Sequence, residues 1–311
     1  MKDLVFIINP AAGNGRGAGT WRKVKKILDR DGVQYRSFQT EYQGHAEILA
    51  RQIASLGNHR LQSITGIGGD GTIHEIINGL SEYEHIHVGY IPAGSGNDIA
   101  RGFKTSKKPA KALKNILKQH NKGKCRVFDG GRLSLDHFGN HRLFLNSAGI
   151  GLDAAVTAAA SQLPFKNMLN KANLGYLSYA AALLHTLQSF QPCNMEAVID
   201  GNSFQFEKVW LIAVANQPYY GGGMKIAPQA VPTDGLLHIT VVKEIPKWKL
   251  LLLFVTVFTG KHTLLKEVEI LTCKEIFLRS EVPLPVQADG EIAGETPVIV
   301  SVLASRMNLL T

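Results

Sequence analysis

The spacing of apolar and polar positions divides the chain into two parts with different elements. In the first 128 residues, short apolar runs alternate with segments whose apolar residues recur at helical spacing. Residues 4–8 form a continuous apolar run, which predicts a buried strand. Trp21, Val24 and Leu28 follow at the spacing of one helix face. Alternating strands and helices are typical of a parallel α/β sheet, so we predict a Rossmann-like α/β domain here.

The same alternation extends along this first part. Gly57 supplies a stop signal for the helix that precedes it. The expected strands or extended segments are 4–8, 33–40, 61–67 and 88–91, and the expected helices cover 21–28, 45–56 and 72–80.

The second part has short apolar runs separated by turn signals, which predicts a β-rich domain, a β-sandwich. Asp200-Gly201 indicates a hairpin turn. We place the boundary near residues 128–131, which gives domains 1–128 and 129–311. Whether the last residues return to the first domain is left open. The expected strands are 142–146, 195–199, 209–214, 237–242 and 298–302, and the helical insertions are 154–161, 174–190 and 247–258.

The formal charge of +9 is concentrated in the first part. Residues 1–128 carry 20 Lys/Arg against 10 Asp/Glu, a net of +10, whereas residues 129–311 carry 14 against 15, a net of −1. A basic half suits phosphate-bearing ligands, nucleic acid or an anionic membrane face, although lysines 107–118 could equally coat a solvated helix.

Other features of the composition point to a cytoplasmic protein that is soluble or peripheral to the membrane. The three cysteines are far apart, which argues against a zinc site or a disulfide framework. The N-terminal apolar run stops at Pro10 and predicts a strand rather than a signal peptide. The most apolar stretch, 250–258, has about half the length of a membrane span.

The segment 68–72, GGDGT, directly follows a predicted strand and begins a predicted helix. Glycines let the backbone approach a ligand closely, and the N–H groups of a helix N-terminus attract phosphate. Asp70 among these donors suggests a metal ion between its carboxylate and phosphate groups, or a water that orients the acceptor. The alternative is a tight strand-to-helix turn in which Asp70 caps the helix.

Two further glycine loops follow predicted strands, NPAAGNG at 9–15 and PAGSGND at 92–98. Loops at the carboxyl ends of neighbouring parallel strands face one crevice, where open α/β sheets bind ligands. Ser95 could donate to a phosphate oxygen, and Asp98 adds a second carboxylate. A GxxxxGK[ST] element is missing, which excludes a P-loop enzyme, and glycines 13, 15, 17 and 19 do not fit the dinucleotide pattern GxGxxG.

With these motifs in order, the sequence resembles the diacylglycerol kinase catalytic-domain family of lipid kinases, which includes bacterial lipid kinases and sphingosine and ceramide kinases. The resemblance covers nearly the whole chain, and Ser95 departs from it, since the family usually has Thr there. The matching motifs are Asn9-Pro10 with Gly13, Thr40 ahead of GHA at 44–46, GGDGTIHEIINGL at 68–80, PAGSGNDIAR at 92–101, GIGLD at 149–153, GGGM at 221–224, PQA at 228–230 with DGL at 234–236, and DGE at 289–291.

The resemblance implies a two-domain fold with the nucleotide in the interdomain cleft, and ATP and Mg²⁺ as cofactors. It implies that Glu291 accepts the proton of the lipid hydroxyl beside Asp289. It also implies that Asp234, with the carbonyls of Val231 and Leu236, holds a structural Mg²⁺. The implied ATP contacts are Asn9, Pro10, Ala11, Ala12, Gly13, Thr40, Gly69, Asp70, Gly71, Thr72, Ile73, His74, Glu75 and Ser95.

Four carboxylates are the predicted catalytic groups: Asp70, Asp98, Asp289 and Glu291. Asp289 and Glu291 are two apart, so in an extended segment both side chains would point to one side. Crowding would then raise one pKa, which suits a proton acceptor near neutral pH. The alternative is that residues 289–291 form a surface turn. Asp129 is expected either to complete this acidic group or to have a role at a turn or helix end.

We therefore predict an ATP- and Mg²⁺-dependent lipid kinase of phospholipid biosynthesis, with a diacylglycerol-like membrane lipid as the favoured acceptor and peripheral membrane contact. Segments 174–190 and 248–258 could hold the lipid or pack on the sandwich. The alternatives are an NAD kinase-like enzyme and a non-catalytic nucleotide-binding regulator at the membrane. A nucleic-acid partner is not expected, since the positive charge lacks interleaved aromatic residues. The identity of the lipid is left open, as is a homodimer.

Overall fold

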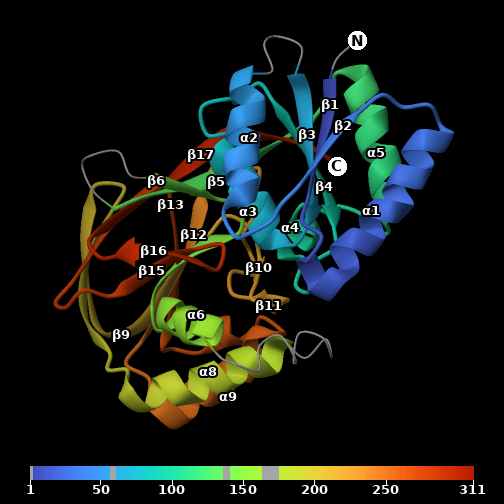
Figure 1. Ribbon diagram of the computed structural model, residues 1–311. Helices are drawn as coiled ribbons and strands as arrows, with labels where there is room; N and C mark the ends of the chain where they lie inside the picture. The colour runs from blue at the N-terminus through green and yellow to red at the C-terminus, as the bar shows by residue number, and fades with distance from the viewer. Residues whose placement is uncertain (1–2, 57–60, 136–140, 163–174) are drawn as a thin grey trace. The chain divides into compact units, whose positions relative to one another are not determined.

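The computed structural model describes the chain except residues 1–2, 57–60, 136–140 and 163–174 (Figure 1). The chain splits into two compact units. Unit 1 comprises residues 1–128 and 305–311, and unit 2 comprises residues 129–304. The chain leaves unit 1 in strand β5 (Arg126–Ser134) and returns to it in strand β17 (Val298–Leu310).

Unit 1 contains a parallel sheet in the order β2-β1-β3-β4, with the end of β17 added beside β4. The last pairing brings Leu309 opposite Val88, so the C-terminal residues complete the sheet of unit 1. The bounds of the strands are β1 (Asp3–Ile8), β2 (Arg36–Gln39), β3 (Leu61–Gly68) and β4 (His87–Pro92).

Helices cover both faces of this sheet (Figure 1). Because side chains alternate along a strand, Leu4, Phe6 and Ile8 of β1 pack in one core with Trp21 of α1 and Ile116 of α5. The opposite face is covered by α2 and α3, which pack against each other. The helices are α1 (Ala12–Arg30), α2 (His45–Leu56), α3 (Asp70–Gly79), α4 (Asp98–Gly102) and α5 (Pro109–Lys122).

Unit 2 is an antiparallel β-sandwich in which the long strand β9 takes part in both sheets. Its first half pairs with β8, and its second half pairs with β7 and β12. Alternate residues of β9 face opposite sides: Ile212 and Val214 point into the sandwich core, whereas Leu211 and Ala213 point to the helices. The strands, together with β5 and β17, are β6 (His141–Phe144), β7 (Ser147–Gly151), β8 (Cys193–Ile199), β9 (Asn202–Ala215), β10 (Tyr219–Tyr220), β11 (Met224–Lys225), β12 (Leu237–Lys243), β13 (Val268–Cys273), β14 (Glu275–Ser280), β15 (Pro285–Ala288) and β16 (Glu291–Glu295).

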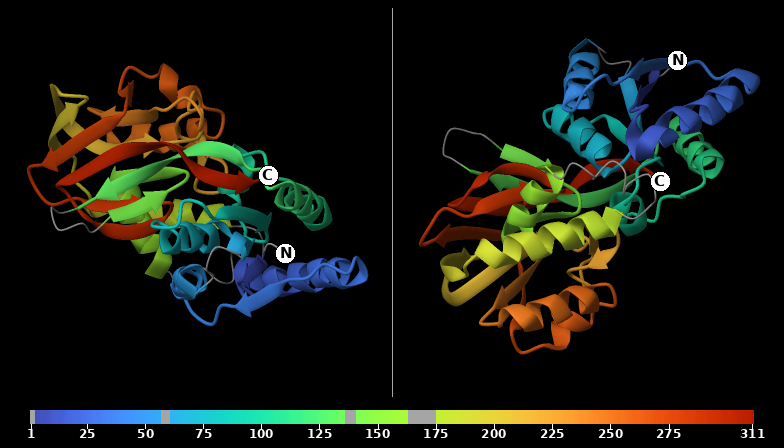
Figure 2. Two further views of the ribbon diagram at one scale, coloured as in Figure 1. Left: turned by 90° about the horizontal axis from the view of Figure 1, so that it is seen from above. Right: turned by 60° about the horizontal axis from the view of Figure 1, so that its bottom comes forward.

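Three helices pack on the outer side of β9 and β12 in unit 2 and form a second core there. Figure 2 shows α8 in yellow and α9 in orange in its right-hand view. Their bounds, with the short 3-10 helix η2 that follows α9, are α6 (Leu152–Gln162), α8 (Gly175–Ser189), α9 (Lys247–Val257) and η2 (Lys261–Leu264).

The observed elements confirm the predicted fold class, a parallel α/β part followed by a β-sandwich. The hairpin at Asp200-Gly201 is also confirmed, because both residues have positive φ between β8 and β9. Most bounds differ from the expected ones: the helix expected at 21–28 covers Ala12–Arg30, the helix expected at 72–80 begins at Asp70, and the strand expected at 142–146 ends at Phe144. Residue 174 of the expected helical insertion 174–190 lies outside the described residues.

Candidate functional site

Three glycine loops of unit 1 lie together at the carboxyl ends of β1, β3 and β4. A Cβ atom on Gly13 would collide with the carbonyl oxygen of Ala93, and one on Gly94 would collide with Gly69. Gly13 also has a φ of 56°, in the left-handed region that favours glycine. Only glycine fits these contacts. The close approach of one loop to another therefore explains why the motifs have glycine at these positions.

Side chains also connect the loops. The Asn9 Nδ2 donates to Thr72 Oγ1 at 3.2 Å, which joins the loop after β1 to the start of α3. The Arg16 Nη2 donates to Ser95 Oγ at 3.1 Å, which joins the loop after β1 to the loop after β4. Arg16 and Ser95 are exposed. The Arg16 guanidinium also donates through Nε to the carbonyl of Gly13 at 3.0 Å, and the sequence analysis missed Arg16 because no motif contained it.

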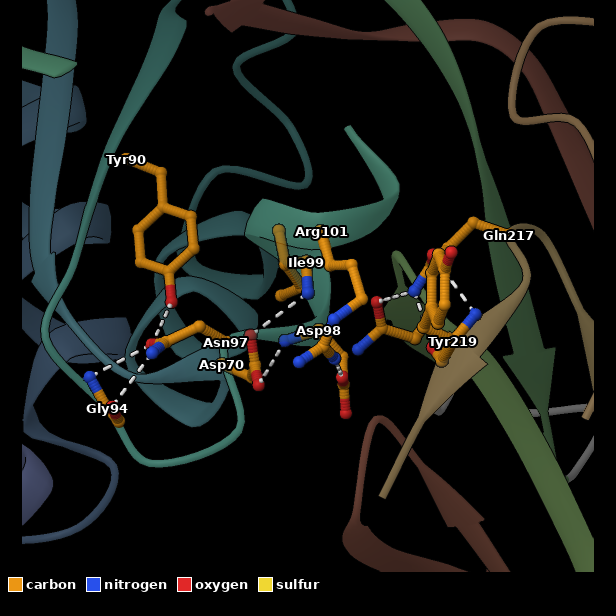
Figure 3. A network of polar contacts seen from close by, with 10 residues as sticks. Asp70, Tyr90, Gly94, Asn97, Asp98, Ile99, Arg101, Gln217 and Tyr219 are labelled. Atoms are coloured by element: carbon orange, nitrogen blue, oxygen red, sulfur yellow. Dashed lines mark hydrogen bonds and ion pairs between the residues drawn. The ribbon is translucent and has the colours of Figure 1, made fainter. Parts of the chain in front are cut away.

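Asp70 caps a helix, but a different one from its own (Figure 3). Its Oδ2 accepts the backbone N–H of Asp98 at 2.9 Å, and its Oδ1 accepts that of Ile99 at 3.1 Å. The N-cap position of α3 belongs to Gly69, which provides no side-chain bond. Asp70 therefore holds the N-terminus of α4 with both carboxylate oxygens, a helix end that favours negative charge.

Asp98 and Tyr90 are buried beside Asp70. Asp98, the second predicted carboxylate of unit 1, is 2% exposed and forms an ion pair with Arg101. The Tyr90 hydroxyl donates to Asn97 Oδ1 at 3.1 Å (Figure 3). Burial, and next the negative charges of Asp70 and Asp98, raise the pKa of Tyr90 well above its ordinary value of 10. Tyr90 therefore stays protonated and serves as a hydrogen-bond donor.

The other residues expected at the nucleotide divide into loop and core positions. Thr40 lies just after β2, and its N–H donates to Ile8 O at 2.8 Å. Glu75 caps α2, since its two carboxylate oxygens accept the N–H groups of Gly44 and Ala46 at 2.9 and 3.0 Å. The side chains of Ile73 and His74 are buried. Pro10, Ala11, Ala12 and Gly71 lie at the starts of α1 and α3. Contact of these residues with a nucleotide stays a prediction.

In unit 2, Asp289 and Gly290 form the two-residue turn between β15 and β16. Both have positive φ, 51° and 90°, and Ala288 pairs with Glu291 across the hairpin. The expectation that Asp289 and Glu291 lie in one extended segment was therefore wrong, and the alternative of a turn is confirmed. The Asp289 carboxylate instead accepts the N–H groups of Leu145 and Asn146 at 2.8 and 2.7 Å, which holds the turn against the start of β7.

Glu291 is the first residue of β16 and is half-buried. The turn before it is fixed by buried Gln287, whose Oε1 accepts the N–H of Gly290 at 2.7 Å. The Gln287 Nε2 donates to Asp153 Oδ2 at 2.8 Å. Glu291 thus directly follows a turn that hydrogen bonds of Asp289 and Gln287 hold in place.

A buried polar network extends from this turn, and sequence reasoning missed most of it. The Gln217 Nε2 donates to Asn146 Oδ1 and to the carbonyl of Tyr219, both at 2.5 Å (Figure 3). The Asn216 Nδ2 donates to the carbonyls of Asp129 and Leu145 at 2.9 Å. The available signal was the polar pair Asn216-Gln217 directly after an apolar strand.

The predicted metal site lies in one turn of unit 2. Asp234 Oδ1 accepts the N–H of Leu236 at 3.0 Å, and Asp234 Oδ2 lies 3.5 Å from His238 Nε2. The carbonyl of Val231 accepts the N–H of Thr233 at 2.7 Å. Beneath the turn, buried Asp129 accepts the N–H of Gly235 at 2.8 Å, which gives it a turn role.

The donor set of this turn fits Mg²⁺ in its chemistry. It offers one carboxylate and two carbonyl oxygens, and Mg²⁺ prefers oxygen ligands and keeps several waters. The Asp234 side chain is 32% exposed, so water can complete the shell. Among the described residues, there is no group of three or more His, Cys, Asp or Glu side chains placed to hold a metal.

Unit 2 also contains an apolar pocket of about 40 Å³ between its helices and β9. Asp153 and Tyr220 contribute polar groups to it. Both apolar segments singled out in the sequence pack against β9 and β12, as the packing alternative predicted, and α9 with Leu183 of α8 also lines this pocket. The main apolar lining residues are Leu152, Val156, Leu183, Leu250, Leu253 and Val257. In the described part of the chain, no helix has the length and apolar character to cross a bilayer.

The parallel α/β part and the β-sandwich are the two parts of the chain that comparisons with known proteins assign to a kinase family. Residues 3–125 match the model of the diacylglycerol kinase catalytic domain. Residues 146–311 match that of the YegS C-terminal NAD kinase beta sandwich-like domain. The chain therefore belongs to the diacylglycerol kinase catalytic-domain family, and it is a kinase.

Relatives match over the full length. A Bacillus subtilis protein named "Putative lipid kinase YtlR" is 37% identical over 96% of each chain. A diacylglycerol kinase of Mycobacterium tuberculosis is 33% identical over 99% of this chain and 94% of its own length. The crystal structure of a "putative diacylglycerol kinase" from Bacillus anthracis superposes with a TM-score of 0.76 at 26% identity, covering 99% of this chain and 97% of that one.

Proposed function

We propose that this kinase transfers the terminal phosphoryl group of ATP, with Mg²⁺, to the hydroxyl of a diacylglycerol-like membrane lipid. The observation that carries the proposal is the assembly of three glycine loops at the carboxyl ends of β1, β3 and β4. Its backbone can approach phosphate groups closely, and Arg16 adds a positive charge at its surface. The names of the relatives support a lipid acceptor.

In this proposal each group has a separate task. The loops and Arg16 bind and orient the phosphates, since phosphoryl transfer depends mainly on positioning and charge stabilisation. Glu291 takes the proton from the lipid hydroxyl. Bound Mg²⁺ supplies neutralisation of phosphate charge at the nucleotide, and a second, structural ion would be held by Asp234 with Val231 and Leu236. Asp70 keeps the loop after β4 in place through α4.

The apolar pocket of unit 2 is the proposed place for part of an acyl chain. Its walls are aliphatic side chains of α6, α8 and α9, and the buried carboxylate of Asp153 lies among them. A soluble acceptor such as a dinucleotide would gain nothing from such walls, whereas a lipid buries apolar surface there. The pocket therefore favours a lipid kinase over the NAD kinase-like alternative.

The test is transfer of label from γ-³²P-ATP to a total lipid extract in the presence of Mg²⁺. We expect a labelled product that migrates with phosphatidic acid, and its loss when Mg²⁺ is omitted. Labelling of NAD in a parallel reaction, with none in the lipid fraction, would show that the acceptor is a soluble nucleotide. Diacylglycerol, phosphatidylglycerol, a sphingoid base and a polyprenol, supplied one at a time, would then identify the lipid.

A further inference from the structure

Helix α9 is apolar on both of its faces. Leu250, Leu253 and Val257 point inward and are 3–4% exposed. Trp248 and Val255 point outward and are 66% and 67% exposed. A helix on the surface of a globular protein normally carries polar residues outward. The outer side of α9 is therefore an apolar surface that the described part of the chain leaves exposed.

The apolar surface extends past the end of the helix. Phe258 follows α9 directly, and Leu264 of η2 is 82% exposed. We name this surface the α9 face and define it by its large exposed apolar side chains. They are Trp248, Leu252, Val255, Phe258 and Leu264.

The charge around the α9 face is positive. Residues 246–266 contain four lysines, 247, 249, 261 and 266, and no Asp or Glu, which gives +4. Lys249 forms an ion pair with Glu267 at 2.6 Å, just outside this range. Lys261 and Lys266 are exposed near Leu264. An isologous contact with a second copy of the chain would bring these lysines close to each other. The resulting charge repulsion disfavours a second copy as the partner on this surface.

An anionic bilayer surface matches both the apolar character and the positive charge of the α9 face. Tryptophan is enriched at membrane interfaces, and each lysine near an anionic leaflet gains favourable electrostatic energy. The helix has 11 residues and is thus ~16 Å long, which is too short to cross a bilayer. Such a helix lies in the plane of the interface with its apolar side toward the acyl chains.

We propose that the α9 face is the surface by which this protein docks on an anionic membrane. The role given to docking, which is access to a lipid substrate, rests on the proposed lipid kinase function. Leu250, Leu253 and Val257 on the inner face of α9 line the apolar pocket, so docking brings that pocket within about one helix diameter, ~10 Å, of the bilayer. A lipid could then place part of an acyl chain in the pocket without first crossing water.

The test uses the tryptophan fluorescence of the full chain. Of the three tryptophans, Trp21 and Trp210 are buried and Trp248 is exposed. Indole emission moves to shorter wavelength when the ring leaves water, so a shift on vesicle addition reports Trp248. We expect this shift with phosphatidylglycerol vesicles, a weaker one with phosphatidylcholine vesicles, and co-sedimentation of the protein with the former.

The decisive variant is Leu252→Glu with Val255→Glu, which leaves Trp248 and the pocket lining unchanged. We expect at least a tenfold loss of vesicle affinity, since two apolar side chains no longer enter the interface. Leu56→Glu, at an exposed leucine in unit 1, is the matched control and should bind as the unchanged protein does. Lys261→Gln and Lys266→Gln should each weaken binding roughly fivefold and reduce its salt dependence.

Two results would overturn the docking proposal: vesicle affinity of the double variant equal to that of the control, or a dimer in sedimentation velocity that the double variant dissociates. Melting temperatures of both variants verify folding. Phosphorylation of a short-chain, water-soluble diacylglycerol should be equal in the double variant and in the control. If neither phosphorylates any lipid while vesicle binding still depends on the α9 face, the proposed function fails and the docking surface stands.

Discussion

At the scale of single residues, Asp70 has a structural role in a glycine loop that the sequence suggested for phosphate binding. Both of its oxygens accept backbone N–H groups of α4, so they fix the loop after β4 relative to the start of α3. The sequence favoured a role on metal or water over capping of the same helix. The geometry reveals capping of another helix, which no motif spacing indicates.

Asp70→Asn should therefore lower stability as well as turnover. The amide keeps one acceptor oxygen and places an NH₂ group against a backbone N–H, so we expect a loss of about 1–2 kcal/mol in the free energy of unfolding. Denaturant melts and steady-state kinetics measure both effects. Asp200→Asn is the control, because the Asp200 carboxylate also accepts backbone N–H groups, from Lys274 and Glu275, but lies in a distant hairpin. Equal turnover in the two variants would limit Asp70 to capping.

Glu291→Gln tests the proton acceptor. The substitution keeps the shape of the side chain and removes its basicity, so turnover should fall by roughly 10²-fold or more while ATP affinity hardly changes. Glu295→Gln, an exposed position on the same strand β16, should retain full turnover. A raised KM for ATP with kcat intact would instead assign Glu291 to nucleotide binding.

Asp234→Ala tests the structural ion. Loss of the bond to the N–H of Leu236 should cost about 1 kcal/mol by itself. If an ion is bound at 100 times its Kd, its removal should cost about 2.7 kcal/mol more. Melting with and without EDTA separates the two contributions, since EDTA should destabilise the unchanged protein and leave the variant unaffected. Equal EDTA effects in both proteins would reject Asp234 as a ligand.

At the scale of elements, the segment after α9 is held by one buried histidine. The His262 Nε2 donates to the carbonyl of Ile226 at 3.0 Å, and its Nδ1 is buried without a hydrogen-bond partner. Burial lowers the pKa of His262 below its ordinary value of 6.5. Protonation of Nδ1 would bury an unsatisfied donor and a charge, so the folded protein keeps the ring neutral.

This arrangement predicts a loss of stability in mild acid. Because the folded pKa is lowered, the unfolded chain binds the proton more readily. The contribution of His262 is therefore fully present above about pH 6.5 and is lost as pH falls toward the folded pKa. Thermal melts between pH 7.5 and 5 should show this decline. His262→Gln can still donate to Ile226 and does not titrate, so its decline should be shallower, whereas identical slopes would exclude His262 as the cause.

The sequence predicted β1, β3 and β4 of unit 1 because these strands are mostly apolar and almost entirely buried. It missed β13 to β16 in unit 2, where half-buried strands such as Glu275–Ser280 mix charged and apolar residues. It offered both a strand and a surface turn at Asp289-Gly290, and the structure has the turn, which carries the same Asp-Gly signal as Asp200-Gly201. The polar pair Asn216-Gln217 was a local signal for a buried network, but its partner Asn146 lies 71 residues away in the chain, and that pairing could not have been predicted.

At the scale of the whole molecule, the family assignment predicts which nucleotide binds. Calorimetry should detect ATP binding that depends on Mg²⁺, and NADPH should not bind as a redox cofactor, since the glycine loops do not follow the GxGxxG pattern. Arg16→Gln should weaken ATP binding by removing a charge at the loops, and Arg22→Gln, at an exposed position farther along α1, is the control. Tight NADPH binding without ATP binding would contradict the prediction.

The connections among the three glycine loops have a consequence for the kinetics of ligand capture. Asn9 is bonded to Thr72, Arg16 to Ser95 and Asp70 to α4, so the loops already hold one another in place. A preorganised receptor of this kind pays little conformational entropy when a ligand arrives. Nucleotide association should therefore follow a single exponential whose rate rises linearly with concentration, without the plateau that a slow closure step would impose.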